Sequence, residues 1–111
     1  MKHFLITYRL KGGLEDRRHR DIRTFVAALD ADPELHGKVA YLTMKRGGSN
    51  DYLHVAAAAD ESAVKLLQSR EFFKSYTART DETAEGEVQV TPLEIVDETS
   101  APVTFPKPVT T

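Results

Sequence analysis

The feature that most constrains the fold of this chain is the order in which its hydrophobic residues change spacing. In residues 4–10 the even positions are all apolar or aromatic, which predicts a β-strand with one buried face. In residues 15–31 the spacing becomes helical, with apolar side chains at i, i+3, i+4 and i+7: Ile22, Phe25, Val26 and Leu29. The dipeptide Asp32-Pro33 ends this helix, because the residue before a proline disfavours helical geometry.

Two further strands follow the first helix. Residues 38–45 and residues 52–58 both alternate along the chain as strands do. The segment Gly47-Gly48-Ser49-Asn50 between them is typical of a hairpin turn. These residues therefore predict an antiparallel strand pair.

The second half of the chain returns to helix and then to strand. Asp60 is a good N-cap for a helix that ends near Gln68, and a second short helix is expected over residues 70–78 after a break at Ser69. Residues 81–86 are acidic and predict a loop. The last strand is expected over residues 87–96, where Pro92 restricts it to a sheet edge or a bulge.

The predicted order β-α-β-β-α-β, with the second helix broken, is that of the ferredoxin-like split βαβ fold. This is an α+β fold with a four-stranded antiparallel sheet and helices on one face. We assign residues 1–98 to this domain and residues 99–111, which contain three prolines, to an extended tail. The opposite sheet face is not fully polar, as Leu5, Leu53 and Val55 indicate. Its burial against an identical sheet across a two-fold axis predicts a homodimer.

Composition narrows the possible chemistry. The 111 residues include no cysteine, which excludes disulfides, thiol nucleophiles, iron–sulfur clusters and thiolate zinc sites. A net charge of −2 argues against nucleic acid as a partner, and no apolar run approaches the length of a membrane span. The first residues carry charge and lack a small-residue cleavage site, so we expect a cytoplasmic protein.

Two segments resemble a known family. The block Asp60-Glu61-Ser62-Ala63-Val64, followed by residues 69–76 (SREFFKSY), is similar to the acidic and S-x-x-F stretch of dimeric α/β-barrel proteins, in particular the antibiotic-biosynthesis monooxygenase-like group. The resemblance implies a homodimeric barrel with the helices outside and a pocket between each sheet and its own helices. Some members oxidise aromatic polyketides or quinols without metal or flavin, others degrade haem, and others are isomerases or have no known activity. The positions that bind and degrade haem in such relatives are occupied here by Tyr8, Leu66 and Tyr76, which argues against haem degradation.

Three residues are the candidates for catalysis: His54, Tyr8 and Tyr76. Oxygenation without a cofactor needs a substrate that deprotonates to an electron-rich anion, a base or hydrogen-bond donors for that anion, and a water-poor cavity. Tyrosine hydroxyls fit the donor role. His54 fits the role of base or hydrogen-bond partner, because the unperturbed pKa of histidine lies near neutrality. The expected substrate is a small aromatic or polyketide-like molecule, bound by Phe72, Phe73 and Leu66.

Structural and functional alternatives remain open. Tyr8 and Tyr76 can be core aromatics whose hydroxyls reach the surface, and the sequence leaves open which sheet face His54 occupies. Residues 15–23 mix both charge signs and predict a solvated helix face, and we expect solvent exposure for His3, His19 and His36. No metal or organic cofactor is expected. The alternative functions are a non-catalytic binding or assembly module of the same fold and a lactone isomerase-like enzyme in which His54 shuttles a proton.

Overall fold

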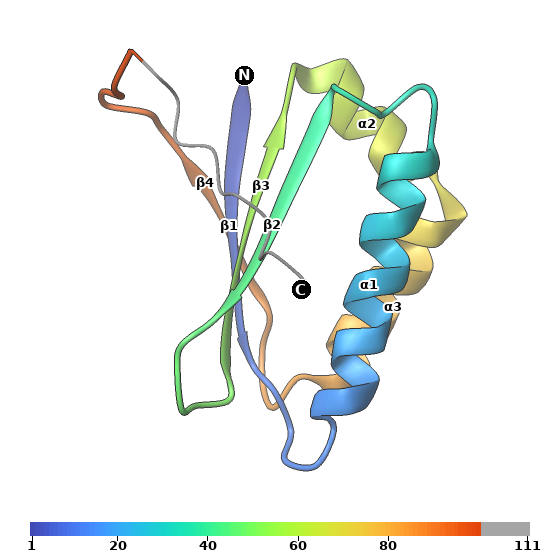
Figure 1. Ribbon diagram of the computed structural model, residues 1–111, viewed down its shortest axis with the longest axis vertical. Coiled ribbons are helices and arrows are strands. Elements are labelled where there is room, and N and C mark those ends of the chain that lie inside the picture. Colours follow the sequence, from blue (N-terminus) through green and yellow to red (C-terminus); the bar gives the residue numbers. More distant parts are fainter. Residues whose placement is uncertain (101–111) are drawn as a thin grey trace, which may run out of the picture.

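The computed structural model describes residues 1–100 of the chain and shows an α+β fold of the ferredoxin-like type. Its four-stranded antiparallel sheet has the strand order β2-β3-β1-β4. The three helices of the described part lie over one face of this sheet (Figure 1). The elements are β1 (Lys2–Arg9), α1 (Glu15–Ala31), β2 (Val39–Lys45), β3 (Asp51–Ala58), α2 (Glu61–Ser69), α3 (Glu71–Thr83) and β4 (Gln89–Leu93). The predicted order of elements and the antiparallel sheet are confirmed.

The strand register decides which side chains face the helices. Tyr8 of β1 lies opposite Tyr52 of β3, and Ile6 lies opposite His54. Side chains directly opposite each other share a face, and residues two apart along a strand do so as well. This register therefore places Tyr8, His54 and Tyr41 of β2 together on the face that the helices cover.

The core beneath the helices is aromatic. Phe25 of α1 is almost fully buried, and its ring stacks on Tyr76 of α3 at 4.0 Å between ring centroids. The same ring meets Tyr41 edge to face at 5.0 Å. Burial of a phenylalanine side chain contributes about 1.5–3 kcal/mol to folding. Phe25 thereby fixes α1 and α3 against the strand that carries Tyr41.

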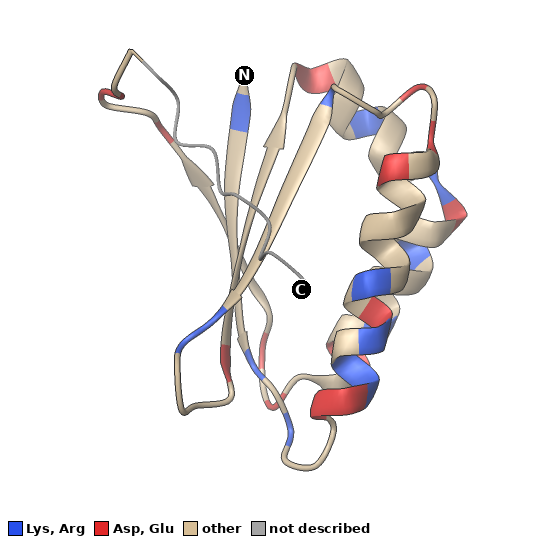
Figure 2. Ribbon diagram, in the orientation of Figure 1, with Lys and Arg blue, Asp and Glu red and all other residues tan. Residues whose placement is uncertain are grey.

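Charged side chains gather on the helices and loops, whereas the strands carry few of them (Figure 2). The prediction that residues 15–23 form a solvated face is wrong at Arg18, which has no exposed surface, and at Asp21, whose side chain is only 11% exposed. His19 also departs from its expected exposure: it is half-buried, and its Nε2 lies 2.8 Å from the Tyr52 hydroxyl. His36 is exposed and His3 is half-buried on the outer face of the sheet.

The helix after the break is longer than the sequence predicts. α3 continues to Thr83, beyond the expected end near Ala78 and into the segment expected to be a loop. Two buried threonines support this extension, since Thr80 donates its hydroxyl proton to the carbonyl of Tyr76 and Thr83 does so to the carbonyl of Arg79. The last strand is shorter than predicted, because β4 spans only Gln89–Leu93. It is an edge strand, as Pro92 requires.

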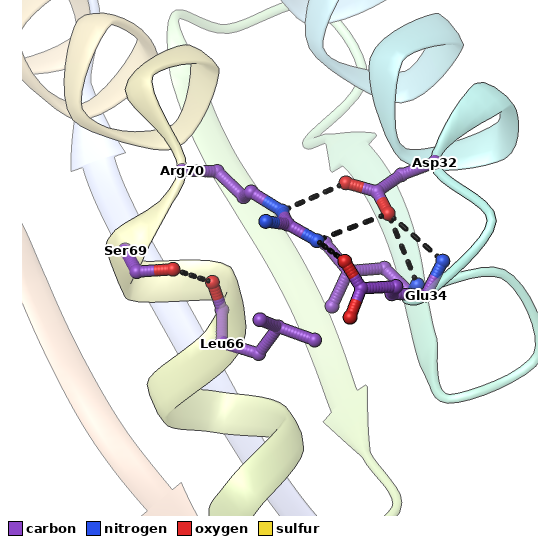
Figure 3. Close-up of polar contacts among 6 residues, drawn as sticks. Asp32, Glu34, Leu66, Ser69 and Arg70 are labelled. Carbon is purple, nitrogen blue, oxygen red and sulfur yellow. Dashed lines mark hydrogen bonds and ion pairs between the residues drawn. The ribbon is translucent and has the colours of Figure 1, made fainter.

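The break between α2 and α3 lies at Arg70, directly after the predicted Ser69. Arg70 has extended backbone geometry, and its guanidinium reaches the loop after α1 (Figure 3). There it donates to Asp32 from Nε at 2.9 Å and to Glu34 from Nη2 at 2.8 Å. These contacts join the α2–α3 corner to the end of α1. The predicted cap of α2 is confirmed, since Asp60 accepts from the Ala63 amide at 2.9 Å.

The described residues contain no helix that is long and apolar enough to cross a membrane. Most of the predicted tail, from residue 101 onward, lies outside the described part of the chain.

Candidate functional site

A cavity of about 310 Å³ lies between the inner face of the sheet and helices α2 and α3. Its wall is mostly apolar, with Phe4, Ile6, Val39, Val64, Leu67, Phe73, Val88 and Val90 among the lining residues. This volume lies at the lower end of the range for small-molecule sites, which are usually apolar with a few placed polar groups. The cavity has the size and character of a site for a compact hydrophobic ligand.

Three polar side chains from three different elements meet at the wall of this cavity. Tyr41 of β2, His54 of β3 and Tyr76 of α3 all line it. The Tyr41 hydroxyl lies 2.7 Å from His54 Nδ1, and the Tyr76 hydroxyl lies 3.3 Å from the same nitrogen. The two hydroxyls are 3.2 Å apart. We call Tyr41, His54 and Tyr76 the wall cluster.

Two further residues extend this cluster away from the cavity. His54 Nε2 lies 3.1 Å from the Tyr8 hydroxyl, and that hydroxyl accepts a 2.8 Å hydrogen bond from Arg18 Nε. Tyr8 and Arg18 do not line the cavity. A continuous hydrogen-bonded chain thus runs from Arg18 through Tyr8 and His54 to the wall cluster.

Each hydrogen bond between Arg18 and the wall cluster can be assigned a donor. We assign the Tyr8 proton to His54 Nε2, because the Tyr8 hydroxyl has no other acceptor for it among residues 1–100. In this tautomer the neutral imidazole carries its proton on Nδ1. That proton faces the hydroxyls of Tyr41 and Tyr76. When one of these hydroxyls donates to the other, a single phenolic O–H is left over. The wall cluster therefore offers one hydrogen-bond donor to a ligand in the cavity.

Burial sets the protonation states of these groups. Burial lowers the pKa of His54 to about 3, and the positive charge of Arg18 acts in the same direction. The imidazole is therefore neutral at physiological pH, unlike a histidine with its usual pKa near neutrality. Burial raises the pKa of Tyr8, Tyr41 and Tyr76 above the ordinary value for tyrosine, while Arg18 opposes this increase. All three tyrosines are protonated donors at neutral pH.

The structure brings some of the predicted site residues together and places others away from the cavity. His54 faces the helices rather than the outer sheet face, and the hydroxyls of Tyr8 and Tyr76 both lie within 3.3 Å of its ring nitrogens. Phe73 lines the cavity, whereas Phe72 and Leu66 pack against the core without lining it. Their roles in binding a substrate stay predictions.

Two residues of the site were missed from the sequence: Tyr41 and Arg18. Arg18 continues the apolar stripe of α1 by one turn, since positions 18, 22, 25 and 29 follow helical spacing. That position on the buried face was the available signal. Tyr41 had no such signal, because only the pairing of β2 with β3 places it beside His54.

No group of three or more histidine, aspartate or glutamate side chains among the described residues is placed to hold a metal ion.

Comparison with known proteins gives a clear answer for the fold. No family model matches the chain, and no curated protein matches it in sequence. Among solved structures, an antibiotic biosynthesis monooxygenase is 14% identical, with a TM-score of 0.75 over 87% of this chain and 100% of its own. The Rv0793 protein of Mycobacterium tuberculosis is 13% identical, with a TM-score of 0.74 over 89% of this chain and 98% of its own.

A third similar structure is SnoaB, a cofactor-independent oxygenase from Streptomyces nogalater. It is 13% identical to this chain, with a TM-score of 0.71 over 90% of this chain and 97% of its own. These likenesses extend over almost the whole of each relative. The chain therefore has the fold of the antibiotic biosynthesis monooxygenases, the group that its sequence resembles.

Proposed function

We propose that the cavity binds a small aromatic molecule with a hydroxyl group and that the protein promotes oxidation of this molecule by dioxygen without a cofactor. The observation that carries the proposal is the wall cluster, which brings Tyr41, His54 and Tyr76 together in a mostly apolar cavity. The likeness of the fold to a cofactor-independent oxygenase supports it.

The chemistry asked of the protein is modest. A deprotonated phenol or enol is electron-rich enough to give an electron to dioxygen, and recombination of the two radicals forms the new carbon–oxygen bond. In the overall reaction a ring CH₂ becomes C=O, and the second oxygen atom leaves as water. The protein orients the ring between apolar walls, donates a hydrogen bond to its oxygen and excludes water. With its pKa near 3, His54 acts as a hydrogen-bonding group rather than as a store for the substrate proton.

Oxygen consumption with a panel of anthrones and dihydroxynaphthalenes tests this function. We expect uptake of dioxygen above the uncatalysed rate and no turnover under anaerobic conditions. Tyr76→Phe should reduce this rate, because it removes a hydroxyl from the cavity wall. Tyr52→Phe is the matched control, since its hydroxyl bonds His19 and does not line the cavity. Binding without oxygen uptake across the panel would favour a non-catalytic module, and anaerobic turnover of a lactone would favour an isomerase.

We also propose that the chain forms a homodimer through the outer face of its sheet. The middle of this face is apolar and half-exposed, with Leu42, Val55 and Leu5 side by side on β2, β3 and β1. Monomeric proteins rarely leave such a continuous apolar patch in water. A two-fold axis covers both copies of the patch at once.

A further inference from the structure

We propose that the buried guanidinium of Arg18 acts through Tyr8 and the wall cluster to hold the hydroxyl group of a bound ligand in its ionised form. The inference rests on the proposed function, since it concerns the ligand of the same cavity. It adds a ligand class, phenols and enols whose solution pKa lies close enough to the ambient pH for a shift of about one unit to ionise them. It also adds a residue on α1, which does not line the cavity.

Arg18 carries a positive charge and forms no ion pair with a carboxylate among residues 1–100. Its side chain is fully buried, and Nε donates to the Tyr8 hydroxyl. Nη1 and Nη2 are buried without a hydrogen-bond partner among residues 1–100. A buried charge is normally paired, because removal from water is costly. An arrangement that keeps this charge unpaired is suited to receive a negative charge nearby.

The charge lies directly behind the cavity wall. Arg18 Cζ is 4.7 Å from the ring centroid of Tyr76 and 5.2 Å from that of Tyr8, so the guanidinium is held against both rings. Tyr76 forms part of the cavity wall. Hydrogen bonds through Tyr8 and His54 connect the cation to the cavity wall. The intervening material excludes water, so the field of the charge is poorly screened.

Two carboxylates lie near this charge, Asp21 and Asp81. Asp21, one turn further along α1, has its Oδ1 3.3 Å from Nη1 of Arg79 on α3, and its Oδ2 is buried without a hydrogen-bond partner among residues 1–100. Asp81 of α3 lines the cavity. Burial raises the pKa of Tyr76, Arg18 lowers it, and Asp21 raises it by less than Arg18 lowers it. Arg18 also lowers the pKa of Tyr41, Tyr8 and His54. At Tyr76, the effect of the Arg18 charge on the pKa therefore outweighs that of Asp21.

The proton of the ligand leaves the protein. His54 does not retain it at neutral pH, and the tyrosines already carry their own protons. The O–H bond of the ligand breaks, the electron pair stays on the ligand oxygen, and the proton passes to the buffer. The spare phenolic O–H of the wall cluster then donates to the new anion. An opposite charge within about 4–6 Å lowers the pKa of an acid by about 1–3 units, whereas burial raises it, as it does for Tyr41 and Tyr76. The inference requires the Arg18 charge and the hydrogen bond from the wall cluster to outweigh the burial of the ligand, with a net lowering of about one unit.

Absorbance titration with 4-nitrophenol tests the inference, since its phenolate absorbs in the visible range. The pKa of the bound phenol should lie about one unit below its value in solution. 4-Nitroanisole has no proton to lose and serves as the control ligand. Arg18→Met should return the bound pKa toward the solution value, whereas Arg18→Lys, which keeps the charge, should preserve most of the shift. Arg20→Met is the matched control: it removes the same charge from the exposed side of α1 and should leave the shift unchanged.

The outcomes separate this inference from the proposed function. If neither 4-nitrophenol nor 4-nitroanisole binds to the wild-type protein, the proposed function fails and the inference fails with it. If both bind but the phenol keeps its solution pKa, or keeps its shift in Arg18→Met, only the inference is overturned. If Arg18→Met does not fold, the inference can be tested on the wild-type protein alone. Calorimetry in buffers of different ionisation enthalpy measures how many protons are released when the ligand binds. Release of a proton on binding 4-nitrophenol below its solution pKa supports the inference, and its absence overturns it.

Discussion

At the scale of single residues, the site is defined by groups whose properties differ from those of the free amino acids. His54 has one per cent of its surface exposed, and burial keeps its imidazole neutral. Arg18 is buried without a carboxylate partner in the described part of the chain. The neutral state of His54 and the missing partner of Arg18 have the same cause, because α1 and the sheet enclose both polar side chains in an aromatic core. These residues are therefore costly to the fold, which indicates a role beyond stability.

The low pKa of His54 predicts a specific dependence of stability on pH. The folded chain binds this proton only near pH 3, whereas a solvated histidine has a pKa of 6.5. Between these values the unfolded chain holds one more proton, so the free energy of unfolding decreases as the pH falls from about 6.5. The slope from this residue is about 1.4 kcal/mol per pH unit. Urea unfolding between pH 7 and 4.5 measures it.

His54→Gln is the matched variant for this prediction, because glutamine fills a similar volume and does not titrate. Its free energy of unfolding should decrease less steeply with falling pH than that of the wild-type protein. The two slopes should differ by about 1.4 kcal/mol per pH unit, which is the contribution of one proton. Equal slopes for the two proteins would show that His54 already titrates normally in the folded state.

At the scale of elements, the corner between α2 and α3 determines one end of the cavity. Leu67 before the corner and Phe73 after it both line the cavity, and Arg70 between them is tied to the loop after α1 (Figure 3). Asp32 both accepts from Arg70 and accepts from the backbone amides of Glu34 and Leu35. One carboxylate thus orders the loop and holds the corner.

This geometry predicts unequal effects of the two acidic partners of Arg70. Asp32→Asn should lower the urea midpoint of unfolding clearly, because it weakens a charge-assisted contact at a side chain that is only 10% exposed. Glu34→Gln should stay near the wild-type midpoint, since its side chain is 65% exposed and such surface pairs contribute little. A larger loss for Glu34→Gln than for Asp32→Asn would contradict this assignment.

At the scale of the whole molecule, the two faces of the sheet differ in what covers them. The helices cover the inner face, whereas no helix or strand of residues 1–100 covers the outer face (Figure 1). The outer face carries Leu42, Val55 and Leu5 at its centre, whereas charged residues gather on the helices (Figure 2). This asymmetry is the basis for the proposed homodimer.

Sedimentation equilibrium at micromolar concentration should give twice the mass of the chain. Val55→Glu should give a monomer, because it introduces a charge at the centre of the outer face, whereas Ala27→Glu on the exposed surface of α1 should remain dimeric. Circular dichroism confirms that each variant is folded. A wild-type protein that sediments as a monomer would exclude the dimer.

The sequence by itself determined the order of elements, because hydrophobic spacing reports which side of each helix or strand is buried. Gly47-Gly48, Asp60 and Pro92 indicated a turn, a helix cap and an edge strand, since each acts through local backbone geometry. The end of α3 was not predictable in this way, because Thr80 and Thr83 favour helix only when their side chains are buried and bonded to the backbone.

Only the tertiary structure decided the composition of the site. Tyr41 lies beside His54 because β2 pairs with β3 in one register, and a shift by one residue would turn it to the outer face. Arg18 belongs to a stretch of charges in the sequence, and its burial depends on how α1 rotates over Tyr8 and Tyr76. Local patterns encode which elements form, whereas the meeting of side chains from five elements depends on packing between residues far apart in the chain.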